Sequence, residues 1–140
     1  MPEFRYVGLA ALQARGMAAI NAAVRESAEH LVGAAQANSD VDTGTQRAGI
    51  HVADVSGGGM SVTAKVATGG ESSGYSIYNH EGTSAHVIRA RPGGVLAFSG
   101  RFATSVQHPG TAPSKFMERA VIAGRPVYLA AMAAAARRYY

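Results

Sequence analysis

The sequence predicts an α+β fold, with a long N-terminal helix, an antiparallel sheet of two hairpins and a C-terminal helix in a single domain of residues 1–140. Three observations lead to this prediction. Apolar residues recur at helical spacing near both ends of the chain, and in the middle they alternate with polar residues. The length of 140 residues is also that of one ordinary domain.

The first predicted element is a helix over residues 7–37. Leu12, Ile20, Val24 and Leu31 fall at multiples close to 3.6 residues, which places them on one face. Alanine at many of the other positions favours a helix. At 1.5 Å per residue the helix is about 45 Å long, which is long for a domain of this size.

Two strands are predicted next, joined by the glycine run at residues 57–59. In the first strand Ala48, Ile50 and Val52 alternate with more polar or smaller residues, and in the second Val62, Ala64 and Val66 do so. A period of two predicts an antiparallel hairpin with one buried face and one exposed face.

A second hairpin is predicted over residues 87–98. Its strands are residues 87–91 and 95–98, and Pro92-Gly93-Gly94 forms the turn between them. Residues 75–78 form either a strand or one helical turn, and residues 99–113 are rich in Gly, Pro and Ser and therefore predict a loop. The sheet and its loops together occupy residues 46–112.

The last element is a helix over residues 113–138. Pro113 suits the first helical position, and Phe116 and Ala120 share one face. We expect the helix to break or kink near Pro126, because proline lacks the N–H donor and clashes with the preceding turn. We expect Phe116 and Tyr78 to lie in the core.

The composition points to a thin core. Hydrophobic residues make up 47% of the chain, which excludes intrinsic disorder, but 28 residues are Ala, 17 are Gly, only five are Leu and none is Trp. No apolar run reaches the length of about 18 residues that a membrane span needs, and the N-terminal residues do not resemble a signal peptide. We therefore expect an intracellular protein that makes no membrane contact.

The positive charge lies in the second half of the chain. Residues 1–70 carry five basic and six acidic side chains, whereas residues 71–140 carry eight and three, and the whole chain has a net charge of +4. Between Glu81 and Glu118 there is no acid. Such a basic zone can meet nucleic acid or an acidic protein surface, and it is equally typical of a solvated face.

No convincing catalytic set is present. Residues 70–74 match the G-x-S-x-G pattern, but they lie in a glycine- and serine-rich loop of a chain too short for a hydrolase fold. The five histidines lack the spacing of metal ligands, and the absence of cysteine excludes disulfides, thiolate metal sites and thiol nucleophiles. We expect no enzymatic activity, no cofactor and no metal.

Two segments share the pattern H-x-G-T. The first is His80-Glu81-Gly82-Thr83, and the second is His108-Pro109-Gly110-Thr111. Glycine supplies a positive φ, and the Thr and His side chains can tie a turn. We predict that these segments are structural turns that flank the second hairpin and fix its orientation.

Four motifs in order carry a family resemblance. They are Val41-Asp42-Thr43-Gly44 with Arg47 and Ile50, the turn Glu81-Gly82-Thr83, the segment His108-Pro109-Gly110-Thr111, and Pro113-Ser114-Lys115-Phe116. Over about residues 40–123 the chain resembles the siphophage neck proteins described as head–tail joining, tail-completion or minor capsid proteins. That family has V-D-T-G-x-x-R-x-x-I, E-G-T or E-x-G-T, and H-P-G-T-x-x-x-P-F in this order. Here Lys115 replaces the proline before Phe116, and the residues after Gly124 have no counterpart.

The resemblance implies a structural virion protein without catalytic activity. Such a protein forms a homo-oligomeric ring, hexameric like the tail, at the neck of the particle and is made in the host cytoplasm. Its axial neighbours are a head-side connector or stopper and a tail terminator or tail tube, and genomic DNA passes through the lumen. Tail terminator and minor capsid protein are alternative roles in the same virion.

The candidate contact residues are the basic side chains. Those expected to face a neighbouring subunit, a partner or DNA are Arg47, Arg89, Arg91, Arg101 and Lys115. Asp42, Thr43 and Gly44 are interpreted as a turn after the first helix. A DNA-binding module that uses the basic half of the chain is the alternative from a different functional class, and a small hydrolase with Ser72 is a third.

Overall fold

The computed structural model describes residues 8–39, 44–58, 61–70 and 73–138. The chain divides into two compact units. Residues 1–73 and 116–140 form the first, which we call the helical unit, and residues 74–115 form the second, the hairpin unit. The predicted α+β class is confirmed, and folding as a single domain stays a prediction.

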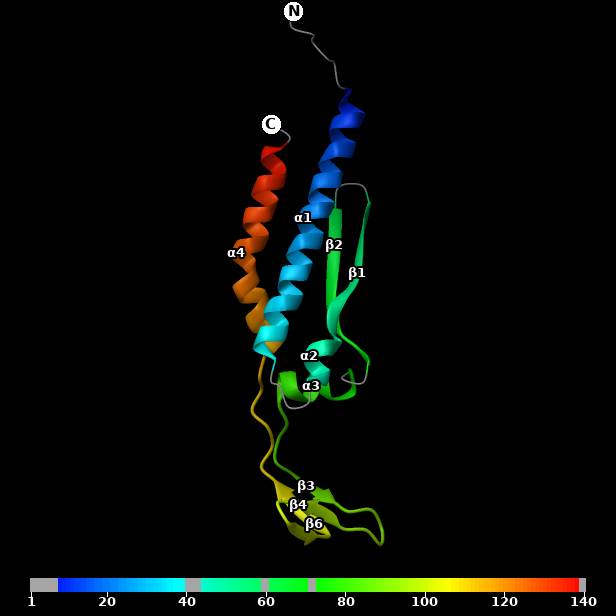
Figure 1. Cartoon of the computed structure of the whole chain (residues 1–140), viewed down its shortest axis with the longest axis vertical. Helices are drawn as coiled ribbons and strands as arrows, with labels where there is room; N and C mark the ends of the chain where they lie inside the picture. The colour runs from blue at the N-terminus through cyan, green and yellow to red at the C-terminus, as the bar shows by residue number, and fades with distance from the viewer. Residues whose placement is uncertain (1–7, 40–43, 59–60, 71–72, 139–140) are drawn as a thin grey trace, which may run out of the picture. The chain divides into compact units, whose positions relative to one another are not determined.

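The helical unit contains two long helices, a short helix and one hairpin (Figure 1). Its elements are α1 (Leu9–Asn38), α2 (Thr45–Gly49), β1 (Ile50–Gly58), β2 (Ser61–Thr68) and α4 (Phe116–Arg137). The hairpin unit contains nearly all of one helix and four short strands. These are α3 (Ser73–Glu81), β3 (His86–Arg89), β4 (Leu96–Phe98), β5 (Arg101–Ala103) and β6 (Ser105–His108). In the part of the chain that the structure describes, no helix is both long enough and apolar enough to cross a membrane.

In the helical unit, α1 packs against α4 and against the β1–β2 hairpin (Figure 1). The two long helices are antiparallel, because the Arg119 guanidinium near the start of α4 donates to the Asn38 carbonyl oxygen at the end of α1, at 2.9 Å. Farther along, a Cβ built on Gly124 would lie 3.9 Å from Cδ1 of Leu31. Gly124 of α4 therefore lies beside Leu31 of α1.

The core of the helical unit surrounds a single aromatic ring. Ala35, Ile50, Phe116 and Ala120 form the buried cluster, and Phe116 is only 1% exposed. The thin, alanine-rich core and the buried position of Phe116 are thus confirmed. The expectation for Tyr78 is wrong: this side chain lies on α3 and is 61% exposed, because the hairpin unit buries no large apolar side chain.

The first hairpin has the predicted pairing. β1 and β2 are antiparallel, with Val52 opposite Val66 and Val55 opposite Ala64. The register shifts between Val52 and Asp54, so one extra residue is accommodated in β1 as a β-bulge. The sequence pattern did not indicate this bulge, because Ala53 fits either face of a strand.

The predicted pairing of the second hairpin is wrong. β3 pairs with β6 and β4 pairs with β5, so residues 99–113 contain two strands where a loop was expected. Pro92-Gly93-Gly94 closes a tight turn, with the Gly94 N–H bonded to the Arg91 carbonyl oxygen at 2.8 Å. The hairpin turn itself lies at Ser99 and Gly100, whose φ values of 48° and 74° suit a two-residue turn between twisted strands.

Three helical features extend or correct the predictions. The short helix α2 occupies residues expected to begin a strand, and α3 decides the open choice at residues 75–78 in favour of a helix. The C-terminal helix begins at Phe116 and continues through Pro126 to Arg137 without a break, and a kink at Pro126 stays a prediction. Pro126 and Ile122, the residue four positions earlier, are both exposed, so water can reach the Ile122 carbonyl group that proline leaves without its helical donor.

Candidate functional site

The two H-x-G-T segments meet at the base of the hairpin unit. The Thr83 N–H donates to the Thr111 carbonyl oxygen at 3.0 Å, and the Thr111 N–H donates to the Thr83 carbonyl oxygen at 3.0 Å and to its Oγ1 at 3.1 Å. These residues form an isolated antiparallel bridge between positions 28 apart in the chain. His80 and Glu81 end α3, and the two segments bind each other through Thr83 and Thr111; their role as structural turns stays a prediction.

The glycines of these segments allow the two backbones to approach. Gly82 and Gly110 have φ values of 75° and 89°, which side chains rarely adopt. A Cβ on Gly110 would lie 2.2 Å from the Thr83 carbonyl oxygen, and one on Gly82 would lie 2.5 Å from that of Thr111. Each glycine therefore makes room for the opposite threonine, and we call this arrangement the Thr83–Thr111 clamp.

A pair of histidines lies next to the clamp, where His86 begins β3 and His108 ends β6. The rings of His86 and His108, which are opposite each other in the β3–β6 ladder, have centroids 5.0 Å apart. The Gly110 N–H donates to Nδ1 of His108 at 3.0 Å, and Nδ1 of His86 lies 2.8 Å from the Ser84 carbonyl oxygen. Both rings thus support the turns beside them. Among the described residues, no group of three or more His, Cys, Asp or Glu side chains could hold a metal ion.

The end of α3 is tied to the segment that leaves the hairpin unit. The Ser114 and Lys115 N–H groups donate to the Asn79 and His80 carbonyl oxygens at 3.0 and 3.1 Å. The Lys115 ammonium group also donates to the Glu81 carboxylate, which accepts a further contact from Nδ1 of His80 at 2.8 Å. The Lys115 ammonium group and the His80 ring together hold the pKa of the Glu81 carboxyl group below its ordinary value.

This ion pair predicts a weak acid dependence of the hairpin unit. Because folding lowers the pKa of Glu81, its stabilising contribution is present above about pH 4.5 and is lost as the pH falls through the lowered pKa. In a carbon-13 NMR titration we expect a Glu81 midpoint below 4.5. Lys115→Gln should move the midpoint upward, and an unshifted midpoint in the unaltered protein would contradict the contact.

The hairpin unit exposes nearly all of its large apolar side chains. On the strands and turns, the exposed residues are Val87 (44%), Ile88 (38%), Val95 (62%), Phe98 (43%) and Phe102 (73%). Tyr75, Ile77 and Tyr78 of α3 are exposed as well. Monomeric proteins rarely leave so many large apolar groups uncovered in a small unit, and such surfaces mark interaction sites.

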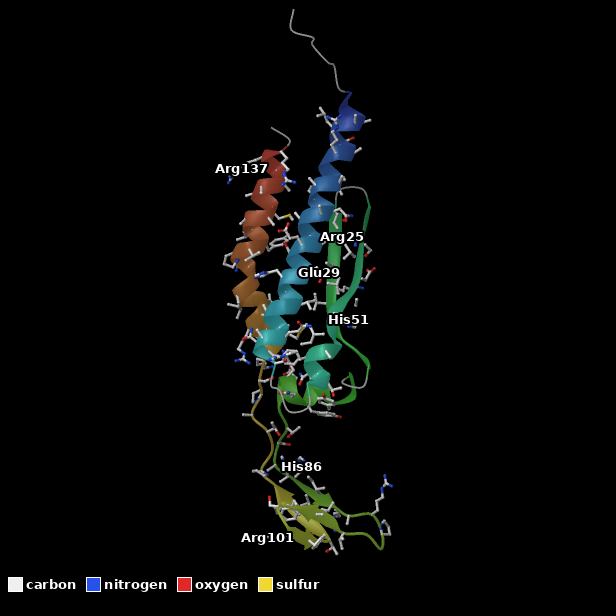
Figure 2. All side chains as sticks on the ribbon, in the orientation of Figure 1. Arg25, Glu29, His51, His86, Arg101 and Arg137 are labelled. Atoms are coloured by element: carbon white, nitrogen blue, oxygen red, sulfur yellow. The ribbon has the colours of Figure 1, made fainter. Side chains whose placement is uncertain are left out.

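Three of the predicted basic residues belong to this unit. Arg89 ends β3, Arg91 precedes the Pro92 turn and Arg101 begins β5, and all three are exposed. Figure 2 shows His86 near the base of the paired strands and Arg101 toward their far end. The one acid in residues 74–115 is Glu81, and Lys115 and His80 already hold its carboxylate. The three arginines therefore have no carboxylate partner within the hairpin unit.

The other predicted residues have different places. Lys115 pairs with Glu81 and so is used inside its own unit. Arg47 is exposed on α2 of the helical unit. Gly44 precedes α2 with a φ of 80°, which agrees with a turn there, whereas Asp42, Thr43 and the Ser72 of the hydrolase alternative lie outside the described residues.

The helical unit carries an apolar groove of about 390 Å³ that the sequence did not reveal. Val24 and Ala28 of α1 line it and are less than 9% exposed. Thr63 of β2 lines it from the β1–β2 hairpin of the same unit. On the α4 side it is lined by Val121 and Tyr128, which are 55% and 44% exposed. No local motif indicates such a groove, because its residues come from three separate elements.

Comparison with known proteins identifies no relative. Neither the protein-family models, nor the curated proteins, nor the solved structures give a significant match to this chain. The function is therefore argued from the residues and their geometry.

Proposed function

We propose that this chain is a structural subunit of a bacteriophage neck, where copies of it form a ring that completes the tail and joins it to the head. The observation that carries the proposal is the hairpin unit, which leaves its large apolar side chains uncovered. The resemblance to siphophage neck proteins over about residues 40–123 supports the choice of virion over other assemblies.

The composition of the exposed surface favours a protein partner. Protein interfaces are enriched in aromatic residues and arginine and depleted in Lys, Glu and Asp. Between Gly82 and Ser114 the chain has two phenylalanines and three arginines, and it has no Lys, Glu or Asp at all. A surface of this kind gains free energy when a neighbour covers it, as in a ring of identical copies.

The hairpin strands also offer free backbone edges. Each of the three sheets among the described residues has only two strands, so every strand has one edge without a partner in its sheet. Such edges can accept a strand from a neighbouring protein. Tail terminator and minor capsid protein remain alternative roles within the same proposal, because both use the same kind of contact.

A substitution at Arg91 tests assembly without disturbing the folding of the monomer. Its side chain is exposed, and no carboxylate of the hairpin unit is free to hold it. We expect Arg91→Glu to leave the circular dichroism spectrum and melting temperature of the monomer unchanged and to weaken self-association at least several-fold, measured by sedimentation velocity. Arg15→Glu, an exposed arginine near the start of α1, is the matched control. Equal behaviour of the two variants would contradict an interface at the hairpin.

The DNA-binding alternative and the ring proposal differ in the DNA affinity that they predict for the free monomer. A free monomer that binds duplex DNA through Arg89, Arg91 and Arg101 should lose affinity steeply with added salt. The ring proposal expects no strong binding of DNA by the free monomer. Fluorescence anisotropy with a labelled duplex at two salt concentrations distinguishes the two functions.

Particles that lack the protein test the role in the virion. If the chain joins the two halves of the particle, electron microscopy will show separate filled heads and free tails, and supplying the protein in trans will restore joining. Intact, infectious particles without it would overturn the proposed function.

A further inference from the structure

We propose that the hairpin unit of one copy docks in the groove between β2 and α4 of the next copy. This inference rests on the proposed function, and it names the two surfaces that make the ring contact. The hairpin unit offers an exposed apolar surface and the helical unit offers a groove, so one chain carries both halves of a heterologous contact.

The two surfaces match in chemistry. The groove is lined by Val24, Ala28, Val121 and Tyr128 among others, and it needs an apolar occupant because water gains few hydrogen bonds there. Phe102 is the most exposed large apolar side chain among the described residues, at 73%. Rigid aromatic side chains that enter a pocket are the usual centres of binding energy in protein interfaces.

The two surfaces also match in size. The groove volume of about 390 Å³ suits a few side chains and not a folded domain. Because a buried aromatic side chain accounts for about 150–250 Å², covering the apolar side chains of the hairpin removes on the order of 500 Å² from water. A stable interface buries about 800 Å² per partner, so the contact must extend to the neighbouring polar side chains.

Charged side chains can add contacts around the apolar centre of this interface. Arg89, Arg91 and Arg101 have no carboxylate of their own unit available. Glu118 is exposed on α4 one helical turn before Val121, whereas the groove lining itself includes Arg125, so the Glu118 side of the groove is where a hairpin arginine can pair. A hairpin arginine that pairs with this carboxylate would fix the register of the docked copy, as exposed charges at the edge of an interface do.

Adjacent residues on α4 provide a matched pair of variants. Val121 lines the groove and Ile122 does not, although both are apolar and more than half exposed. We expect Val121→Arg to reduce self-association of the full chain at least tenfold and Ile122→Arg to leave it unchanged, measured by sedimentation velocity over a concentration series. Thr63→Arg, on the β2 side of the groove, should act like Val121→Arg and serves as the second variant if Val121→Arg fails to fold.

Variants of the other surface complete the test. Phe102→Ser should abolish assembly, and Leu12→Ser, at an exposed apolar residue on α1 that does not line the groove, should not. A mixture of the Val121→Arg and Phe102→Ser proteins retains one intact hairpin and one intact groove. It should therefore form a one-to-one dimer that grows no further, although each variant alone stays monomeric.

The possible outcomes separate the two proposals. An unaltered protein that stays monomeric at every concentration, or that binds duplex DNA as a monomer, overturns both the ring and the docking. An unaltered protein that forms a ring of fixed mass, while folded Val121→Arg and Thr63→Arg form the same ring, overturns the docking alone. A mixture of the two variants that yields no dimer also overturns the docking.

Discussion

Replacing Gly110 with valine will open the base of the hairpin unit and leave the helical unit folded. The glycine has a φ of 89°, and a Cβ there would lie 2.2 Å from the Thr83 carbonyl oxygen and 2.8 Å from the Ser84 carbonyl carbon. Backbone strain alone amounts to about 1–3 kcal/mol, and the overlap with another backbone segment adds to it. We expect the Thr83 and Thr111 amide hydrogens to exchange at the rate of the open chain.

Gly93 provides the control for this prediction. It has a φ of 77°, but nothing lies within 4 Å of where its Cβ would be. Gly93→Val therefore introduces backbone strain without the overlap, and it should perturb only the turn after Arg91. If the two substitutions have equal effects on the exchange of the threonine amides, the close approach in the Thr83–Thr111 clamp is refuted.

Truncating Phe116 to alanine will destabilise the helical unit by about 3–5 kcal/mol. Among the described residues, Phe116 is the largest side chain that is almost wholly buried, and the cluster around it combines alanines with Ile50 and partly buried residues such as Leu31. Two of the three other buried members of the cluster are Ala35 and Ala120, whose methyl groups cannot move into the cavity, so much of the lost packing is not recovered. The free energy of unfolding, measured by urea denaturation of the monomer, checks the magnitude.

Phe102→Ala is the matched control. The same side chain is removed from a site that is 73% exposed, so the free energy of unfolding of the monomer should change by no more than about 0.5 kcal/mol. A loss at Phe116 as small as that at Phe102 would show that the cluster around Ala35 and Ile50 is not the core that stabilises the unit.

Sequence patterns predicted the elements whose signal is local. The helical period over residues 7–37 and the alternation around Ile50 and Val62 correspond to α1, β1 and β2. Each of the repeated H-x-G-T segments contains a glycine, and both glycines have a positive φ. Such a position can be predicted locally, because glycine adopts this conformation more readily than other residues.

Pairing between distant segments was harder to predict. Pro92-Gly93-Gly94 is a strong turn signal. Residues 87–91 were therefore predicted to pair with residues 95–98 across it. The actual hairpin turn at Ser99-Gly100 is weaker in sequence, because a serine at positive φ is uncommon. Similarly, the basic zone predicted exposed arginines, but nothing in it indicated that Lys115 would pair with Glu81.

The Thr83–Thr111 clamp has a consequence for how such proteins can diversify. It joins the two segments that enter and leave residues 84–110, and the β3–β6 ladder continues the pairing beyond it, so this stretch is held together at its base. The entropic cost of closing a loop rises only slowly with its length, so a longer or shorter stretch here changes the stability little. Natural selection can therefore adjust the reach of the hairpin to a differently sized neighbour without redesigning the scaffold that carries it.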